Sequence, residues 1–157
     1  MTSHLSAVKE FLFYEMYARH NLETVLPILL ERCLKRKWSV VIQSSSIEEC
    51  DALDNYLWSY SEDSFLPHIV SYGKGCKDSP IILTADRDNM YQAVVRVLVN
   101  RAIPPDLQGY MRSVFIFDGS NSEELAQATS YWQIFSTSRH KMSYWKQDAY
   151  GCWIKKY

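Results

Sequence analysis

Two aspartates are the residues of this chain with the clearest capacity for phosphate chemistry. Asp86 follows the apolar run Pro80–Thr84. Asp118 follows the run Val114–Phe117, so we expect both carboxylates at the carboxyl ends of strands. Open α/β sheets bind ligands at that edge, and two carboxylates there could hold a magnesium ion that activates attack on a phosphate. An ordinary turn or helix-cap role explains the two aspartates equally well, because Asp118 is followed by Gly-Ser.

The histidines and cysteines do not show the spacing that catalysis or metal binding requires. The four cysteines are Cys33, Cys50, Cys76 and Cys152. They contain no Cys-x-x-Cys pair, so we predict buried thiols in a reducing compartment rather than disulfides or a zinc site. No histidine pairs with Cys or Asp at a catalytic or metal-ligand spacing; they are His4, His20, His68 and His140. Next to Pro67, His68 is predicted to be an interface or loop histidine rather than a general base. We therefore expect no catalytic residue, metal or cofactor from these groups.

A serine loop, Ser44–Ser46, lies between a predicted strand and a predicted helix, where a helix N-terminus offers free N–H groups to an anion. The glycines that let a backbone wrap a phosphate are missing, and no Gly-Lys-Ser/Thr follows. Ser46 and Glu49 instead have the spacing of a capping box. The loop therefore predicts the start of a helix rather than a nucleotide site.

Strands alternate with helices along the chain, which predicts a single three-layer α/β domain over residues 1–157, Rossmann-like, with a mostly parallel central sheet. Helical spacing of apolar residues gives helices at 22–34, 47–58, 90–102 and 123–135. Apolar runs give strands at 11–16, 38–42, 80–84 and 114–117. A C-terminal antiparallel hairpin is expected from 142–145 and 152–155 around the turn 148–151. Pro27 is expected in the first turn of its helix or at a kink.

Length and charge limit the classes of function. A chain of 157 residues with 47% hydrophobic content can bury one substantial core, so one domain is expected. The formal net charge of −1 argues against a protein that wraps nucleic acid directly, and we expect DNA contact to be indirect. The N-terminus lacks a secretory pattern and no apolar run approaches ~20 residues, so we predict a cytoplasmic protein without a membrane contact.

The segment Leu53–His68, which reads LDNYLWSYSEDSFLPH, places several large apolar groups where a folding core would not need them. It begins as the end of an amphipathic helix and passes Trp58 into a polar turn. That turn delivers Phe65, Pro67 and His68, a combination that favours a contact surface over a buried strand. The alternative is that Trp58 and Phe65 cap the core from one side.

This string resembles the chi subunit of bacterial DNA polymerase III holoenzyme. The resemblance continues upstream in FLFYEM, LPILLERCLKRKW and SVVIQ, and downstream in PIILTAD, VFIFDG and HKMSYWKQDAYGCWIKK. Only residues 87–112 lack a counterpart, so we interpret them as an insertion or a divergent element. The resemblance implies a non-catalytic replication accessory that links the clamp loader to single-stranded DNA-binding protein. It also implies that Trp58, Phe65, Pro67 and His68 contact the psi subunit or another clamp-loader subunit.

The resemblance further implies a second contact on the helix before the hairpin. In the family, basic and aromatic residues there receive the acidic, Phe-ended tail of single-stranded DNA-binding protein. Trp132 matches the aromatic position, whereas the family's basic positions carry Thr129, Gln133 and Ser136 here. Arg139, Lys141 or Lys146 would replace those charges from the adjacent turn and strand, which gives the tail-binding set Thr129, Trp132, Gln133, Arg139 and Lys141.

Three alternatives remain open at this point. Trp132 is a core residue, or the chain is a chi-like scaffold whose tail contact has been lost. The third is an enzyme, a small metal-dependent phosphatase or nucleotide-binding α/β protein that uses Asp86 and Asp118.

Overall fold

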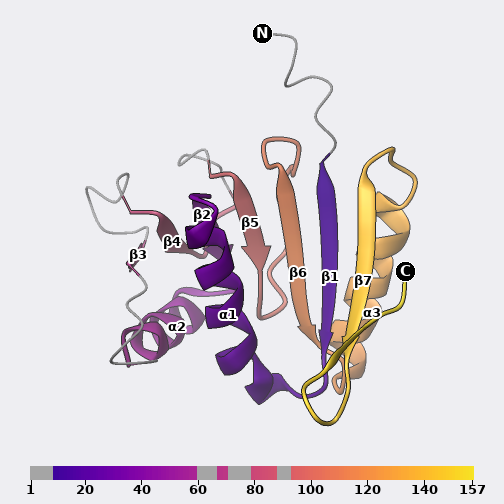
Figure 1. The fold of residues 1–157 in the computed structure, drawn as a ribbon, viewed down its shortest axis with the longest axis horizontal. Coiled ribbons are helices and arrows are strands. Elements are labelled where there is room, and N and C mark those ends of the chain that lie inside the picture. Colours follow the sequence, from indigo (N-terminus) through magenta and orange to yellow (C-terminus); the bar gives the residue numbers. More distant parts are fainter. Residues whose placement is uncertain (1–8, 60–66, 71–78, 88–92) are drawn as a thin grey trace, which may run out of the picture.

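The computed structural model describes residues 9–59, 67–70, 79–87 and 93–157. In these ranges the chain forms one sheet of eight strands in the order β3-β4-β2-β5-β6-β1-β7-β8 (Figure 1). All neighbouring strands pair in parallel except β7 and β8, which are antiparallel. The predicted α/β class and the C-terminal antiparallel hairpin are therefore confirmed. The strands are β1 Glu10–Met16, β2 Val40–Gln43, β3 His68–Val70, β4 Ile81–Thr84, β5 Val95–Leu98, β6 Arg112–Asp118, β7 Lys141–Gln147 and β8 Trp153–Lys155.

Helices cover both faces of the sheet and make the three layers. The α-helices are α1 Leu22–Lys35, α2 Ile47–Ser59 and α3 Ser122–Phe135, and a short 3-10 helix, η2 Arg19–Asn21, precedes α1. The apolar stripes of α1 and α2 pack on one face, and α3 packs on the other with the chain that follows β5 (Figure 1). Alternation along each strand divides the side chains between these two cores. In β1, Phe13 faces α3 while Leu12 and Tyr14 face α1.

Pro27 lies inside α1, beyond its first turn. Because proline lacks an N–H, the carbonyl of Glu23 loses its usual partner within the helix. The Tyr56 hydroxyl of α2 donates a hydrogen bond to that carbonyl. The proline thus leaves the Glu23 carbonyl free to accept the hydrogen bond that connects α1 to α2.

The helix predicted at residues 90–102 is wrong, because the structure places strand β5 at Val95–Leu98 in the middle of the sheet. The run is short and rich in β-branched valines, which stiffen the side chain and favour strands. Asn100 and Arg101 follow in left-handed conformations, with φ of 52° and 65°, and turn the chain away from the sheet. The described part of the segment 87–112 thus supplies a central strand of the sheet.

A fully buried arginine fixes this segment to its neighbours. Arg96 of β5 is 0% exposed on the α3 side of the sheet. It donates to the Gln43 side chain, to the Asp86 carbonyl and to the Tyr110 hydroxyl over distances of 2.6 to 3.0 Å. A buried charge requires such satisfaction by hydrogen bonds. Arg96 therefore ties β5 to β2 and to the loop before β6.

Candidate protein-interaction surfaces

Trp58 forms an exposed aromatic site at the C-terminal end of α2. The buried face of that helix carries Leu53 and Leu57, so the next side chain points outward, and Trp58 is 53% exposed. Its ring lies on the ring of His68, with 4.3 Å between centroids. The Asp54 carboxylate accepts a hydrogen bond from the Trp58 indole at 3.0 Å and lies 3.2 Å from Nε2 of His68. These contacts hold the indole in one place at the surface.

The structure changes the expected role of His68. The prediction of a loop or interface histidine is wrong in its location, since His68 begins strand β3 and its side chain is fully buried beneath Trp58. Pro67 is half-buried just before the strand. Phe65 lies outside the described residues. Trp58 and Pro67 thus remain as surface residues of this set, with His68 as their support, and the alternative that Trp58 caps the core does not fit its exposure.

Trp132 of α3 lies at the outer margin of the second core, where it packs edge-on against Phe13 at 5.2 Å and Tyr144 at 5.6 Å. The ring of Tyr157 lies 5.5 Å from it on the outer side. Trp132 is partly buried, which leaves part of its surface for a ligand. Its neighbours Thr129, Gln133 and Ser136 are exposed on the same helix, and the Thr129 and Ser136 hydroxyls donate to carbonyls within the helix. The rings of Trp132, Tyr144 and Tyr157 therefore form the apolar part of this surface.

The cations around Trp132 differ from those predicted. Lys141 begins β7 and pairs with Glu10 at 3.8 Å, on the side of the sheet that faces α1. Because side chains alternate along a strand, Lys146 faces α3 instead, where it lies 3.7 Å from Glu15. Arg139 is exposed in the turn before β7. The placement of Lys141 beside Trp132 is thus wrong, and Lys146 is the strand lysine on that face.

Sequence reasoning also missed the group that holds Lys146. The Tyr144 hydroxyl donates to Glu15. Burial raises the pKa of Tyr144, and the bond to Glu15 raises it further, so the phenol stays a donor at neutral pH. The signal was present in KMSYWKQ, where alternation puts Tyr144 and Lys146 on one face.

The two aspartates of the enzyme hypothesis do not form one site. Asp86 is exposed after β4, whereas Asp118 is buried at the end of β6 and accepts from the Ser120 amide and hydroxyl at 2.9 and 2.6 Å. Strands β2 and β5 separate β4 from β6, so the strand ends lie roughly 14 Å apart. Among the described residues, no group of three or more His, Cys, Asp or Glu side chains could hold a metal ion. Asp118 serves the turn into α3.

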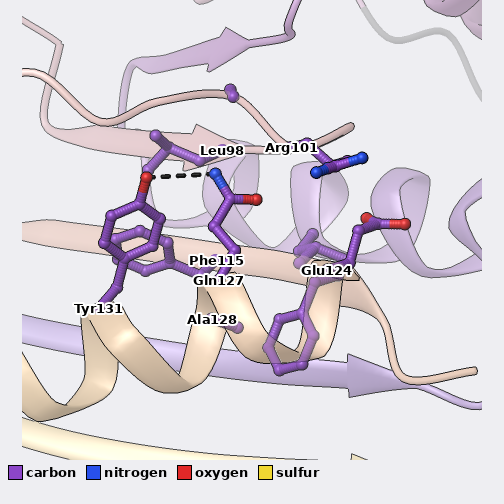
Figure 2. Close-up of a pocket in the computed structure, with 10 residues that line it drawn as sticks. Leu98, Arg101, Phe115, Glu124, Gln127, Ala128 and Tyr131 are labelled. Carbon is purple, nitrogen blue, oxygen red and sulfur yellow. Dashed lines mark hydrogen bonds between the residues drawn. The ribbon is translucent and has the colours of Figure 1, made fainter. Parts of the chain in front are cut away.

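A small cavity between α3 and strands β5 and β6 has a volume of about 20 Å³, room for about one water molecule. Figure 2 shows the Gln127 amide and Tyr131 hydroxyl hydrogen-bonded across it, with Arg101 and Glu124 toward its other end. Burial raises the pKa of Glu124. Its Oε2 has no hydrogen-bond partner among the described residues, although Arg19 lies 4.0 Å away. The cavity is too small for a nucleotide.

The thiols follow the prediction only in part. Cys33 and Cys50 are buried and free, and burial raises the pKa of each to about 11. Cys152 is free but exposed in the closing hairpin, contrary to the prediction, and Cys76 lies outside the described residues. Within those residues, no helix is both long enough and apolar enough to cross a membrane.

Two comparisons with known proteins agree on the same family. The model of the family "DNA polymerase III chi subunit, HolC" matches residues 8–143. Over 155 residues the chain is 23% identical to a protein of Rickettsia prowazekii (strain Madrid E) named "Probable DNA polymerase III subunit chi". The similarity covers 94% of this chain and 92% of that protein.

Proposed function

Because the chain belongs to the DNA polymerase III chi subunit family, we propose that it is a non-catalytic accessory of DNA replication that links the clamp loader to single-stranded DNA-binding protein. Family membership supports the role in replication. The two partners and the absence of catalysis are parts of the proposal. Contact with DNA is indirect, which agrees with a formal net charge of −1.

The separation of the two aromatic surfaces is the observation that carries this proposal. Trp58 lies beside β3 at one edge of the sheet, whereas Trp132 packs on β1 and β7 (Figure 1). Strand β3 and strand β1 are five positions apart, which is roughly 24 Å at the usual spacing. Two partners can therefore occupy these surfaces at the same time, as a linking protein requires.

The Trp132 surface suits the acidic, Phe-ended tail. A terminal phenyl ring can pack against Trp132 and Tyr157, where its apolar area leaves water. Lys146 and Arg139 are exposed nearby and can pair with the tail's carboxylates. With two cations available, the contact is weak and sensitive to salt.

The Trp58 surface suits a clamp-loader subunit, psi or another. A half-exposed tryptophan held by neighbouring groups resembles the anchors that carry most of the energy of protein interfaces. Among the described residues, strand β3 is the last of the sheet on this side and offers an edge for further contact. The partner is expected to bury the indole together with Pro67.

Reciprocal alanine variants test both contacts. The clamp-loader complex of the same organism and a peptide of acidic residues ending in Pro-Phe serve as the two probes. Trp132→Ala should lose the peptide and keep the clamp loader, and Trp58→Ala should do the reverse. Each variant is the folding control for the other, and the wild-type protein should bind both probes in one complex.

Binding of the two probes that is mutually exclusive would contradict the linking role. Loss of both contacts in both variants would show that the tryptophans support the fold rather than bind partners. Magnesium-dependent turnover of nucleotides or phosphomonoesters, abolished by Asp118→Asn, would overturn the non-catalytic part of the proposal.

A further inference from the structure

A groove lies on the α1 side of the sheet, apart from both surfaces described above. Strands β1 and β7 have no helix in front of them on that side in Figure 1. Val114 and Ile116 of β6, in contrast, are buried in the core that α1 forms. The groove between α1 and the β7–β8 hairpin has a volume of about 440 Å³. Its main walls are Val25, Ile28 and Leu29 of α1, and Tyr14, Trp145 and Trp153 of the sheet.

The wall of the groove that the sheet contributes consists of aromatic side chains that contact neighbouring groups. Tyr14 and Trp153 meet edge to face, with 5.3 Å between ring centroids. The Lys155 ammonium lies 5.8 Å from the centroid of Trp145. Such rings contribute large apolar area to an interface at little cost in conformational freedom.

The opposite wall has the spacing of a helix-packing ridge. Val25, Ile28, Leu29 and Arg32 stand at i, i+3, i+4 and i+7 on one side of α1. Ile28 is 42% exposed in the middle of this ridge. The ridge and the side chains of β1, β7 and β8 opposite it together line a site that a further helix of this layer could occupy.

Charge distinguishes one end of the groove from the other. Arg32 is the charged residue among its described lining residues, and Gln147 and Thr24 line the other end. Glu10 is engaged by Arg112 and Lys141 at the base of the strands. No ion pair involving Arg32 or Lys155 is found among the described residues, so both remain available to an acidic partner.

We propose that this groove is a docking site for an amphipathic helix of a partner protein, whose apolar face packs between α1 and the hairpin and whose acidic side chains meet Arg32 and Lys155. The groove favours a polypeptide over nucleic acid, since single strands need a positively charged groove along their backbone, and Arg32 is the charged residue among its described lining residues. The site is independent of the Trp132 surface, because Trp145 and Tyr144 point to opposite faces of the sheet.

A designed helical peptide provides the probe. It has 18 residues, a leucine stripe at helical spacing and glutamates flanking that stripe, and it is compared with the same peptide carrying lysines at the glutamate positions. Fluorescence anisotropy of the labelled peptides should show micromolar binding of the acidic peptide, at least ten-fold tighter than the lysine peptide. Single-stranded oligothymidylate of similar length is the third arm and should not bind measurably.

Variants locate the binding. Ile28→Ala should weaken the acidic peptide roughly five-fold or more, and Arg32→Glu should weaken it more strongly and remove the preference for acid. Ile134→Ala is the matched control, since Ile134 is a 60% exposed helical isoleucine of α3 on the other side of the sheet. Thermal unfolding of each variant verifies that the fold is retained.

Three results would overturn the proposal. They are failure of the acidic peptide to bind wild-type protein, equal binding by the Ile28, Arg32 and Ile134 variants, and preferential binding of the oligonucleotide. Binding of a Phe-ended acidic tail to the Trp132 surface should be unchanged in Ile28→Ala, so the two proposals can fail separately.

Discussion

The two lysines of β7 offer the sharpest test of the tail-binding surface. Lys146 and Lys141 are both exposed, at 53% and 66%, but alternation places them on opposite faces of the sheet. Lys146→Ala should weaken an acidic, Phe-ended peptide, because the ammonium lies on the same face as Trp132 and Tyr144. Lys141→Ala should leave that affinity unchanged, and it is matched in residue type, strand and exposure.

The structure sets the size of the expected effect. Lys146 is solvent-exposed and already lies 3.7 Å from Glu15, so its pairing with a peptide carboxylate should contribute only about 0.2 to 1 kcal/mol. Removing it should therefore raise Kd roughly 1.5- to 5-fold. Trp132→Ala should cost more, at least about ten-fold, because burial of a phenyl ring contributes roughly 1.5 to 3 kcal/mol. Total affinity should be micromolar or weaker, about −8 kcal/mol at best.

Titration calorimetry at two salt concentrations separates the charge contribution from the apolar one. Affinity of the wild-type protein should fall from 50 to 200 mM salt, and it should fall less steeply for Lys146→Ala. A peptide without its terminal Phe should not bind. Equal losses in Lys141→Ala and Lys146→Ala would refute the assignment of faces, and unchanged binding in Trp132→Ala would place the site elsewhere.

Further predictions concern the other surface, the buried carboxylate and the thiols. Trp58→Ala should lose clamp-loader association. Because the indole is 53% exposed, the free energy of unfolding should fall by less than the roughly 3 to 5 kcal/mol expected for truncation of a core ring. A larger fall would show that Trp58 has a structural role. Burial raises the pKa of Glu124 above its ordinary 4.5, so the contribution of this carboxyl to stability is fully present below pH 4.5 and is lost as pH rises through the higher folded-state pKa. Glu124→Gln should therefore raise Tm at pH 7 but not at pH 3.5, and an equal shift at both would exclude this cause. Iodoacetamide at pH 8 should modify Cys152 in the folded protein but not Cys33 or Cys50, whose thiolate fraction is about one in a thousand at a pKa of about 11; peptide mass mapping reads the result.

The fold was predictable where local patterns and tertiary packing agree. Strands β1, β2, β4 and β6 arise from apolar runs between turn signals, and the closing hairpin from its Asp148–Gly151 turn. Strand β5 was missed because periodicity cannot separate a short apolar run in a strand from one in a helix. The burial of the charged Arg96 in this strand could not be predicted either, since its partners Gln43 and Tyr110 come from distant parts of the sequence.

In the candidate surfaces, too, local pattern predicted some features, whereas others depended on the tertiary structure. The outward direction of Trp58 follows from the helical spacing of Leu53 and Leu57, which the sequence displays. To predict which face of the sheet Lys141 occupies, one must know which face α3 covers. That depends on the path of the chain across the sheet rather than on local pattern. Side chains alternate between the two faces along a strand, so an error in the face of one residue assigns every side chain of that strand to the wrong face.

Strand β7 explains how a protein of formal net charge −1 can present two surfaces suited to acidic partners. Tyr144 and Lys146 serve the α3 side, and Trp145 between them serves the groove on the α1 side. Glu10 and Glu15 pair with Lys141 and Lys146, but these two carboxylate side chains are only 15% and 11% exposed. Other acidic side chains lie in the first turn of α3, where Glu123 and Glu124 meet the positive end of the helix dipole. The exposed charge beside each lysine of β7 is therefore basic, although charges of both signs nearly cancel over the whole chain. Net charge argues against wrapping of nucleic acid, which needs a clustered excess of cations, but it leaves recognition of acidic peptides open on both faces of the same sheet.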